Sequence, residues 1–186
     1  VRFLWRQDRS ERFKEFLLGN VDIVHSTTFC APRFHRRRRR LVVTIYDLSF
    51  VTHPESHLPA NVEHCLRGTK LAIDRADALI AISESARREL IDEMGAPPER
   101  IVVTPLASDP RLLRVSDPAR LAAVRRRYEL PERFILFLGA VEPRKNLLRL
   151  IEAFAALKPA LRRETPLVVA GANGWLNDSV RERVDT

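Results

Sequence analysis

The feature that most constrains this chain is an apolar run that ends in a glycine and is followed by two adjacent cations. Ile135–Leu138 suits a buried strand, Gly139 follows it, and residues 142–146 read Glu-Pro-Arg-Lys-Asn. Asn146 is a residue type that often caps helices, and the apolar residues after it recur at helical spacing. A strand, a tight turn and a helix in this order are typical of an α/β fold with parallel strands.

This stretch has the chemistry of a diphosphate site. The start of a helix offers unpaired backbone N–H groups and a partial positive charge, and Gly139 lets a ligand approach the backbone closely. Arg144 can grip phosphate oxygens with its planar fork of donors, while Lys145 acts as a point charge. The same residues also fit a solvated Arg-Lys pair on a surface loop, and the local pattern does not decide between the two.

Five ordered blocks of the sequence resemble retaining glycosyltransferases of the GT-B fold, the group often called glycosyltransferase family four. The blocks are VVTIYDLSFVTHPE (42–55), RADALIAISESARREL (75–90), RIVVTPLASD (100–109), FILFLGAVEPRKNLLRLIEAFA (134–155) and LVVAGANGW (167–175). The resemblance implies an α/β chain of the GT-B type, with two Rossmann-like parallel-sheet domains that are both incomplete. Residues 1–105 would belong to the acceptor-side domain, 106–116 to the interdomain linker, and 117–186 to the nucleotide-sugar-binding domain.

The chain starts at Val1 and shows no counterpart of two blocks of that family, its N-terminal Gly-rich loop and its late Glu-x7-Glu block. We therefore expect an internal fragment that is inactive by itself. By the resemblance, Gly139, Arg144 and Lys145 would bind the donor diphosphate. Three more residues are candidates to line the cleft: Ser83, Glu142 and Gly171.

The resemblance also places Tyr46 and Asp47 near the transferred sugar, as the catalytic pair. Many family members carry a histidine where this chain has Tyr46. A tyrosine can donate a hydrogen bond, but it is neutral near pH 7 and cannot act as a cation. Asp47 follows a nearly continuous apolar strand over 41–46, so it faces the edge where open α/β sheets bind ligands. Capping of the next turn is an equally good interpretation of Asp47.

Charge is concentrated in the run from Arg36 to Arg40, within a chain of net charge +8. This run fits a solvated connector, and it also fits a peripheral contact with an anionic membrane that carries a lipid-linked acceptor. Single-strand nucleic-acid modules interleave aromatic with basic residues, whereas only Phe34 borders this run. We therefore expect no specific nucleic-acid partner.

Several function classes are excluded by what the sequence lacks. The Gly-x-Gly-x-x-Gly fingerprint and the Walker phosphate loop are both absent, which argues against dehydrogenases and P-loop enzymes. Cys30 and Cys65 lack Cys-x-x-Cys spacing, and the histidines form no metal-binding motif, so we expect no metal and no cofactor. No apolar run reaches the ~18 residues that span a bilayer. We expect a cytoplasmic protein, and a peripheral position at the inner face of the membrane fits the same prediction.

Some local expectations can be compared directly with a structure. Periodicity predicts helices over 5–18 and 59–76, a helix after Ser83 capped by its hydroxyl, and a helix from Asp117 with Leu121, Val124 and Tyr128 facing inward. Pro159 is predicted to end the helix that follows Asn146. His25 is interpreted as a strand-end histidine with a structural hydrogen bond.

Taken with the resemblance, these patterns predict a retaining hexosyltransferase-type enzyme of polysaccharide biosynthesis. It would move a sugar from a nucleoside diphosphate donor to a glycan or lipid-linked acceptor. One alternative is a non-catalytic nucleotide- or polyanion-binding domain on the same fold, because a fold does not fix a function. A third interpretation keeps the GT-B fold with epimerase or phosphorolysis chemistry.

Overall fold

The computed structural model describes residues 21–31, 39–175, 180 and 182–183. The helix expected over 5–18 and the arginines at 36–38 lie outside the described residues. The chain divides into two compact units, Val1–Ala107 and Ser108–Thr186. Each unit is described by itself.

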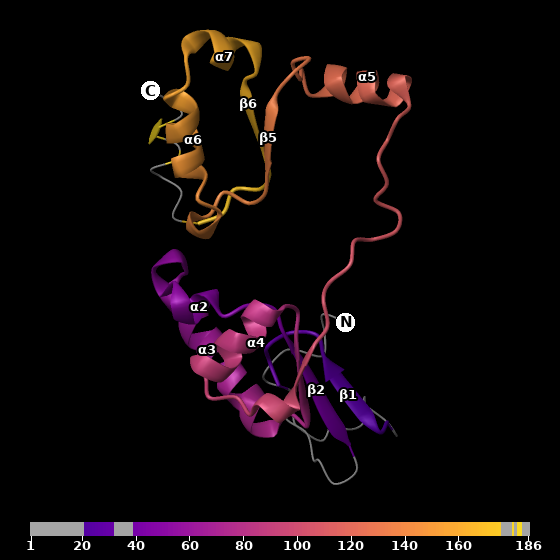
Figure 1. Ribbon diagram of the computed structural model, residues 1–186, viewed down its shortest axis with the longest axis vertical. Coiled ribbons are helices and arrows are strands. Elements are labelled where there is room, and N and C mark those ends of the chain that lie inside the picture. The colour runs from indigo at the N-terminus through magenta and orange to yellow at the C-terminus, as the bar shows by residue number, and fades with distance from the viewer. Residues whose placement is uncertain (1–20, 32–38, 176–179, 181, 184–186) are drawn as a thin grey trace. The chain divides into compact units, whose positions relative to one another are not determined.

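The first unit is built on a four-stranded parallel sheet in the order β1-β2-β3-β4. The strands are β1 (Ile23–Ser26), β2 (Arg40–Ile45), β3 (Ala78–Ala81) and β4 (Ile101–Val103). The long helix α3 (Pro59–Arg75) connects β2 to β3, and α4 (Glu84–Asp92) connects β3 to β4. Successive right-handed crossovers that step in the same direction place their helices on one face of a sheet. Figure 1 shows α3 and α4 on the same side of this sheet.

The core lies between those helices and the sheet. Leu41, Val43 and Ile45 alternate along β2 and are fully buried, as is Leu90 of α4. Burying an aliphatic side chain of this size contributes about 1.5–3 kcal/mol. At Gly68 of α3 an added Cβ would lie 2.8 Å from the ring of Phe29, so this glycine lets the aromatic ring pack on the helix.

The helix ends of this unit follow the sequence signals closely. The Ser83 hydroxyl accepts the Ala86 N–H at 3.1 Å as the N-cap of α4, which confirms the predicted cap. Gly95, at φ 65°, follows that helix in the left-handed region that glycine tolerates. One guanidinium nitrogen of Arg100 donates to the carbonyls of Ile73 and Ala76 at 3.2 and 3.1 Å, which satisfies the C-terminus of α3.

Two short elements follow β2 and reverse the chain before α3. They are the single-turn helix α2 (Ser49–Thr52) and the 3₁₀ turn η1 (Pro54–Ser56). A second 3₁₀ turn, η2 (Pro98–Arg100), leads into β4. At the first position of β2, the last arginine of the basic run, Arg40, forms an ion pair with Asp77 at 2.9 Å.

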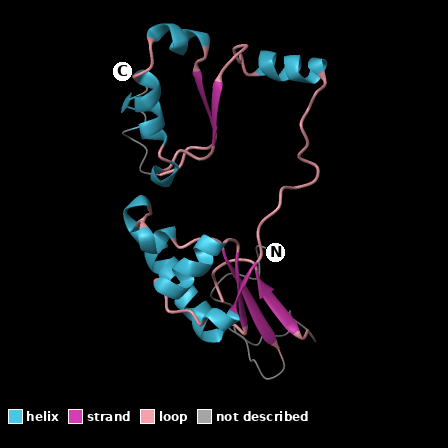
Figure 2. Cartoon of the chain, in the orientation of Figure 1, coloured by secondary structure: helices cyan, strands magenta, loops and turns pink. Residues whose placement is uncertain are grey.

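The second unit holds a pair of parallel strands, β5 (Ile135–Leu138) and β6 (Leu167–Ala170), in the register Ile135↔Leu167. The connection between them runs through the 3₁₀ turn η3 (Pro143–Lys145) and the helices α6 (Leu147–Ala155) and α7 (Pro159–Glu164). The helix α5 (Pro118–Arg127) precedes β5 (Figure 2). The Asp117 carboxylate caps α5 by accepting the Ala119 N–H at 2.9 Å.

Three local expectations in this unit are wrong. Leu121 and Val124 of α5 and Tyr128 just after it are 45%, 48% and 61% exposed, so the predicted inward face lacks a covering layer within the described residues. Asn146 stands at the N-cap position of α6, but its backbone is left-handed and its side chain makes no cap bond, because the η3 turn precedes it. Pro159 begins α7, whereas α6 already ends at Ala155.

Candidate functional site

The loops that leave β5 and β6 run side by side at the carboxyl end of the strand pair. The Gly139 N–H donates to the Ala170 carbonyl at 2.9 Å, and the Val141 N–H donates to the Ala172 carbonyl at 3.0 Å. A Cβ added at Gly171 would lie 1.9 Å from the Gly139 oxygen. The close approach of these two loops therefore requires a glycine at position 171. The first residues of the turn after β6 are thus hydrogen-bonded to the loop after β5.

Gly139 itself is under no such packing constraint. Among the described residues, a Cβ at this position would meet only the ring of Phe137, at 3.8 Å, which is an ordinary van der Waals contact. The protein's own packing therefore does not explain why this strand ends in a glycine. The sequence interpretation of Gly139 as a place of close ligand approach stays a prediction.

The η3 turn brings Glu142 and Arg144 together. The Glu142 side chain is 4% exposed, and its Oε1 lies 2.7 Å from Nε of Arg144, whose side chain is 40% exposed. The turn is closed by the Lys145 N–H, which donates to the Glu142 carbonyl at 3.0 Å. Glu142 therefore holds one edge of the Arg144 guanidinium from a buried position, a contact that was not part of the sequence prediction.

Lys145 lies at the end of the same turn and is exposed. Within the part of the chain that the structure describes, its ammonium group forms no ion pair. The loop therefore carries one balanced Glu-Arg pair and one unbalanced cation. This arrangement can attract an anion and also offer it a guanidinium in a fixed orientation.

In the first unit, the predicted site residues follow two neighbouring strands. Ile45 of β2 pairs with Ala81 of β3, so Tyr46 and Asp47 leave the sheet at the same edge as Ser83. Tyr46 and Asp47 are both exposed. The Ser83 hydroxyl is occupied as the helix cap, and the structure assigns it no second role.

Asp47 takes part in a chain of hydrogen bonds. Its Oδ1 accepts the backbone N–H of Ser49 at 2.9 Å and the Ser49 hydroxyl at 2.6 Å. The Ser49 Oγ in turn lies 3.0 Å from Nε2 of His57. Asp47 thus caps the turn after β2, as one of the two sequence interpretations proposes. Sequence reasoning missed His57, because no motif signals a contact that depends on the chain reversal through η1.

The remaining candidate groups are structural. Nε2 of His25 lies 2.9 Å from the Thr44 hydroxyl, which confirms the predicted structural hydrogen bond. Burial raises the pKa of the Cys30 thiol, and burial followed by the nearby Cys30 and Asp47 raises the pKa of Cys65. Both thiols are therefore poor nucleophiles near neutral pH. The described residues include no cluster of three or more His, Cys, Asp or Glu side chains suited to a metal ion.

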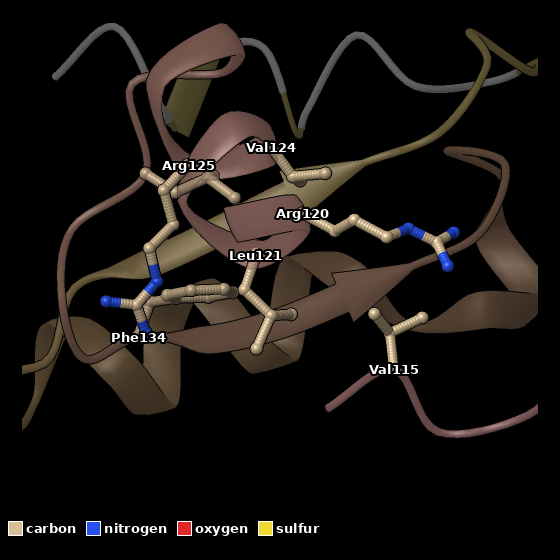
Figure 3. A pocket seen from close by; sticks show the side chains of 7 residues that line it. Val115, Arg120, Leu121, Val124, Arg125 and Phe134 are labelled. Carbon is tan, nitrogen blue, oxygen red and sulfur yellow. The ribbon is translucent and has the colours of Figure 1, made fainter. Parts of the chain in front are cut away.

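A pocket of about 270 Å³ lies in the second unit, beside α5. Its lining is mainly apolar and consists of Val115, Arg120, Leu121, Val124, Arg125, Leu130 and Phe134. Phe134 precedes β5 whereas Gly139 follows it. The pocket is therefore at the opposite end of the strand from the loop over residues 139–146, which we call the Arg144 loop. In Figure 3 the guanidinium groups of Arg120 and Arg125 extend toward opposite sides of the pocket.

Parallel α/β units with polar residues gathered at the carboxyl ends of their strands are the architecture of open α/β proteins that bind ligands at that edge. The crystal structure of HepE from Anabaena in complex with UDP-glucose matches this fold with a TM-score of 0.57 and 23% identity, over 81% of this chain and 38% of that one. The predicted GT-B fold class is confirmed.

The family model described as Glycosyltransferase Family 4 matches residues 2–112, more than half of the chain. The chain belongs to this family. A second model, Glycosyl transferases group 1, matches residues 124–185. None of the helices that the structure describes has both the length and the apolar character to cross a membrane.

Two curated relatives illustrate the range of the similarity. O-antigen chain mannosyltransferase B of Escherichia coli is 32% identical over 164 residues, which cover 88% of this chain and 42% of the relative. D-inositol 3-phosphate glycosyltransferase of Thermobispora bispora is 38% identical over 169 residues, 84% of this chain and 38% of the relative. The chain thus spans about two fifths of the length of these relatives.

Proposed function

We propose that the protein is a retaining glycosyltransferase that moves a sugar from a nucleoside diphosphate donor to a glycan or lipid-linked acceptor. The observation that carries this proposal is the loop after β5, where the buried Glu142 holds Arg144 beside the exposed Lys145. Family membership supports the reaction class. Similarity to an O-antigen mannosyltransferase and to a protein crystallised with UDP-glucose supports the donor class and a role in polysaccharide synthesis.

The Arg144 loop would act on the leaving group. When the bond between the sugar and the diphosphate breaks, negative charge grows on the departing phosphate. Arg144 and Lys145 would stabilise that charge where it develops, and only interactions that are stronger in the transition state than in the ground state raise the rate. Loss of one such donor costs about 3 kcal/mol in the barrier, by analogy with other preorganised anion sites.

The contact with Glu142 determines which N–H donors of Arg144 can bind phosphate oxygens. A guanidinium has five N–H donors, and its Nε is the atom that lies 2.7 Å from Oε1 of Glu142. The two terminal nitrogens are at the other end of the group, and they can form the paired bonds that phosphate oxygens accept. Because the buried partner fixes the side chain in advance, less conformational entropy is lost when the donor binds.

In the first unit, Tyr46 and Asp47 would act at the sugar and the acceptor. The Tyr46 hydroxyl would donate a hydrogen bond to the donor sugar, and the Asp47 carboxylate would accept one from the acceptor hydroxyl. Exclusion of water from the reacting sugar would prevent hydrolysis of the donor. No step of this scheme uses a metal or a cofactor, since the nucleoside diphosphate sugar is a substrate.

The donor site is tested by thermal shift on the full-length protein. Uridine, guanosine and adenosine diphosphate sugars are titrated against the wild type, the Arg144→Ala/Lys145→Ala double variant and a control, Arg163→Ala, which removes an exposed arginine of α7. Ligand-linked stabilisation grows with ligand concentration over the dissociation constant. We expect one base to raise Tm in the wild type and the control but not in the double variant.

Two other outcomes would count against the proposal. A wild type that folds normally and responds to no donor would favour a non-catalytic polyanion-binding domain, and steep salt dependence of heparin binding would then support that alternative. A double variant that responds like the wild type would remove Arg144 and Lys145 from the donor site. Retention itself is checked by NMR of the anomeric configuration of the first product formed.

A further inference from the structure

The hydrogen-bond chain behind Asp47 assigns a role to a histidine that no motif singles out. Asp47 follows β2, Ser49 begins α2, and His57 is the first residue after η1. The Ser49 hydroxyl lies 2.6 Å from Oδ1 of Asp47 and 3.0 Å from Nε2 of His57. Three side chains are thus linked in series at the edge of the sheet where Tyr46 also emerges.

The number of protons available determines which group donates in each hydrogen bond of this series. A serine hydroxyl carries a single proton, and its short contact with the carboxylate shows that Asp47 accepts it. The Ser49 oxygen can then only accept from His57, so Nε2 of His57 must carry a proton. Both the neutral tautomer protonated at Nε2 and the imidazolium make this donation. The structure therefore predicts which ring nitrogen of His57 is protonated.

The series does more than close a turn. The backbone N–H of Ser49 already caps the turn by donating to Asp47, and the α2 turn is closed by the Thr52 and His53 amides, which donate to Leu48 and Ser49. The added hydroxyl and imidazole act instead on one oxygen of a carboxylate whose residue is exposed, while Ser49 and His57 are half-buried. Two partly buried groups thus orient one accessible carboxylate.

We propose that His57 is a positioning residue that acts through Ser49 to hold the Asp47 carboxylate in one orientation toward the acceptor hydroxyl. This inference rests on the proposed function, because it deepens the role given there to Asp47. The two bonds from Ser49 to Oδ1 help to fix the direction in which the Asp47 carboxylate faces. A correctly oriented acceptor hydroxyl gains in rate because the reacting atoms start close to their reactive geometry.

The first test detects the hydrogen bond between His57 and Ser49 and needs no ligand. Long-range ¹H–¹⁵N NMR spectra of the imidazoles in the full-length protein distinguish the two tautomers, and His57 is assigned by its loss in His57→Leu. We expect protonation at Nε2 in the wild type and a mixed tautomer signal in Ser49→Ala. A neutral His57 protonated at Nδ1 and not at Nε2, or a signal that Ser49→Ala leaves unchanged, would overturn the proposal.

The second test measures the effect of His57 on the rate of sugar transfer. Initial rates are measured with the donor selected by thermal shift and octyl α-mannoside as acceptor. We expect His57→Leu to lower kcat about tenfold, as for loss of one hydrogen bond to a charged network. His57→Gln, whose amide N–H can reach the same oxygen, should recover most of this loss. His53→Leu is the matched control, since His53 contacts Glu55 at 3.5 Å and is not part of the series.

A double-mutant cycle separates action through Ser49 from an independent effect. If His57 works through Ser49, then Ser49→Ala and the Ser49→Ala/His57→Leu double variant have the same kcat. The assignment would be overturned if the kcat of the double variant fell by the product of the two single effects. An unchanged kcat in His57→Leu, or an equal loss of kcat in His53→Leu, would overturn it as well. A wild type with the Nε2 signature but no transfer would count against the proposed function, while the hydrogen-bond series would stand.

Discussion

At the scale of single residues, the most informative contact is the one between Glu142 and Arg144. A carboxylate next to the proposed diphosphate site would be unfavourable unless a cation neutralised it, and Arg144 lies 2.7 Å away. The two side chains therefore act together, and the buried Glu142 orients the exposed Arg144. The net attraction for an anion then comes from Lys145 together with the donors that Arg144 has left.

We expect Glu142→Ala to lower kcat in the full-length protein by the equivalent of about 1.5–3 kcal/mol, the range for a hydrogen bond to a charged group. The physical reason is that Arg144 loses the partner that fixes it before the donor binds. Steady-state kinetics measure the effect, with Glu152→Ala as a control on the exposed surface of α6. A kcat equal to that of the wild type would mean that Arg144 needs no anchor.

At the scale of elements, the loops after β5 and β6 behave as one structure because backbone hydrogen bonds link them. Two glycines in these loops have opposite constraints. Gly171 has no room for a Cβ, whereas Gly139 has room and yet lacks one. The first glycine is explained by packing, and the second is the one that a ligand would explain.

Alanine at each position separates these two roles. Gly171→Ala is expected to destabilise the fold by about 1–3 kcal/mol, as for other overpacked sites, because its Cβ would collide with the Gly139 carbonyl. Gly139→Ala should leave Tm unchanged and weaken the stabilisation by the donor. Thermal unfolding with and without donor measures both. Equal behaviour of the two variants would contradict this division.

The same scale shows what the sequence could predict. Strands, helix starts and helix stops depend on neighbours in the chain, so Ser83, Gly95 and Asp117 act where local chemistry places them. The apolar stripe of α5 has helical periodicity, but a stripe does not specify its partner, and here it is half exposed. The contacts of Glu142 and His57 depend on 3₁₀ turns that reverse the chain, and no pattern of spacing encodes those turns.

At the scale of the whole molecule, the division into two units falls at Ala107 and Ser108. Residues 104–109 and 112–117 have no regular structure, and Leu112 and Leu113 are each 77% exposed. Within this segment the Arg111 guanidinium, and then its backbone N–H, hold the pKa of Asp109 below its usual value by donating hydrogen bonds. The Arg111 side chain is exposed and the Asp109 side chain is partly exposed, so this pair contributes little to stability.

Such a segment should be the first point of proteolytic attack between residues 39 and 175, because proteases need a stretch of chain that can adopt an extended form without unfolding a core. We expect trypsin to cut first, within that range, after Arg111 or Arg114, and to leave two lasting pieces that mass spectrometry identifies. The Arg111→Gln/Arg114→Gln double variant should slow this cut, while Arg163→Ala should not. An earlier cut inside α3 or α6 would mean that the cores of the two units are less stable than their buried residues indicate.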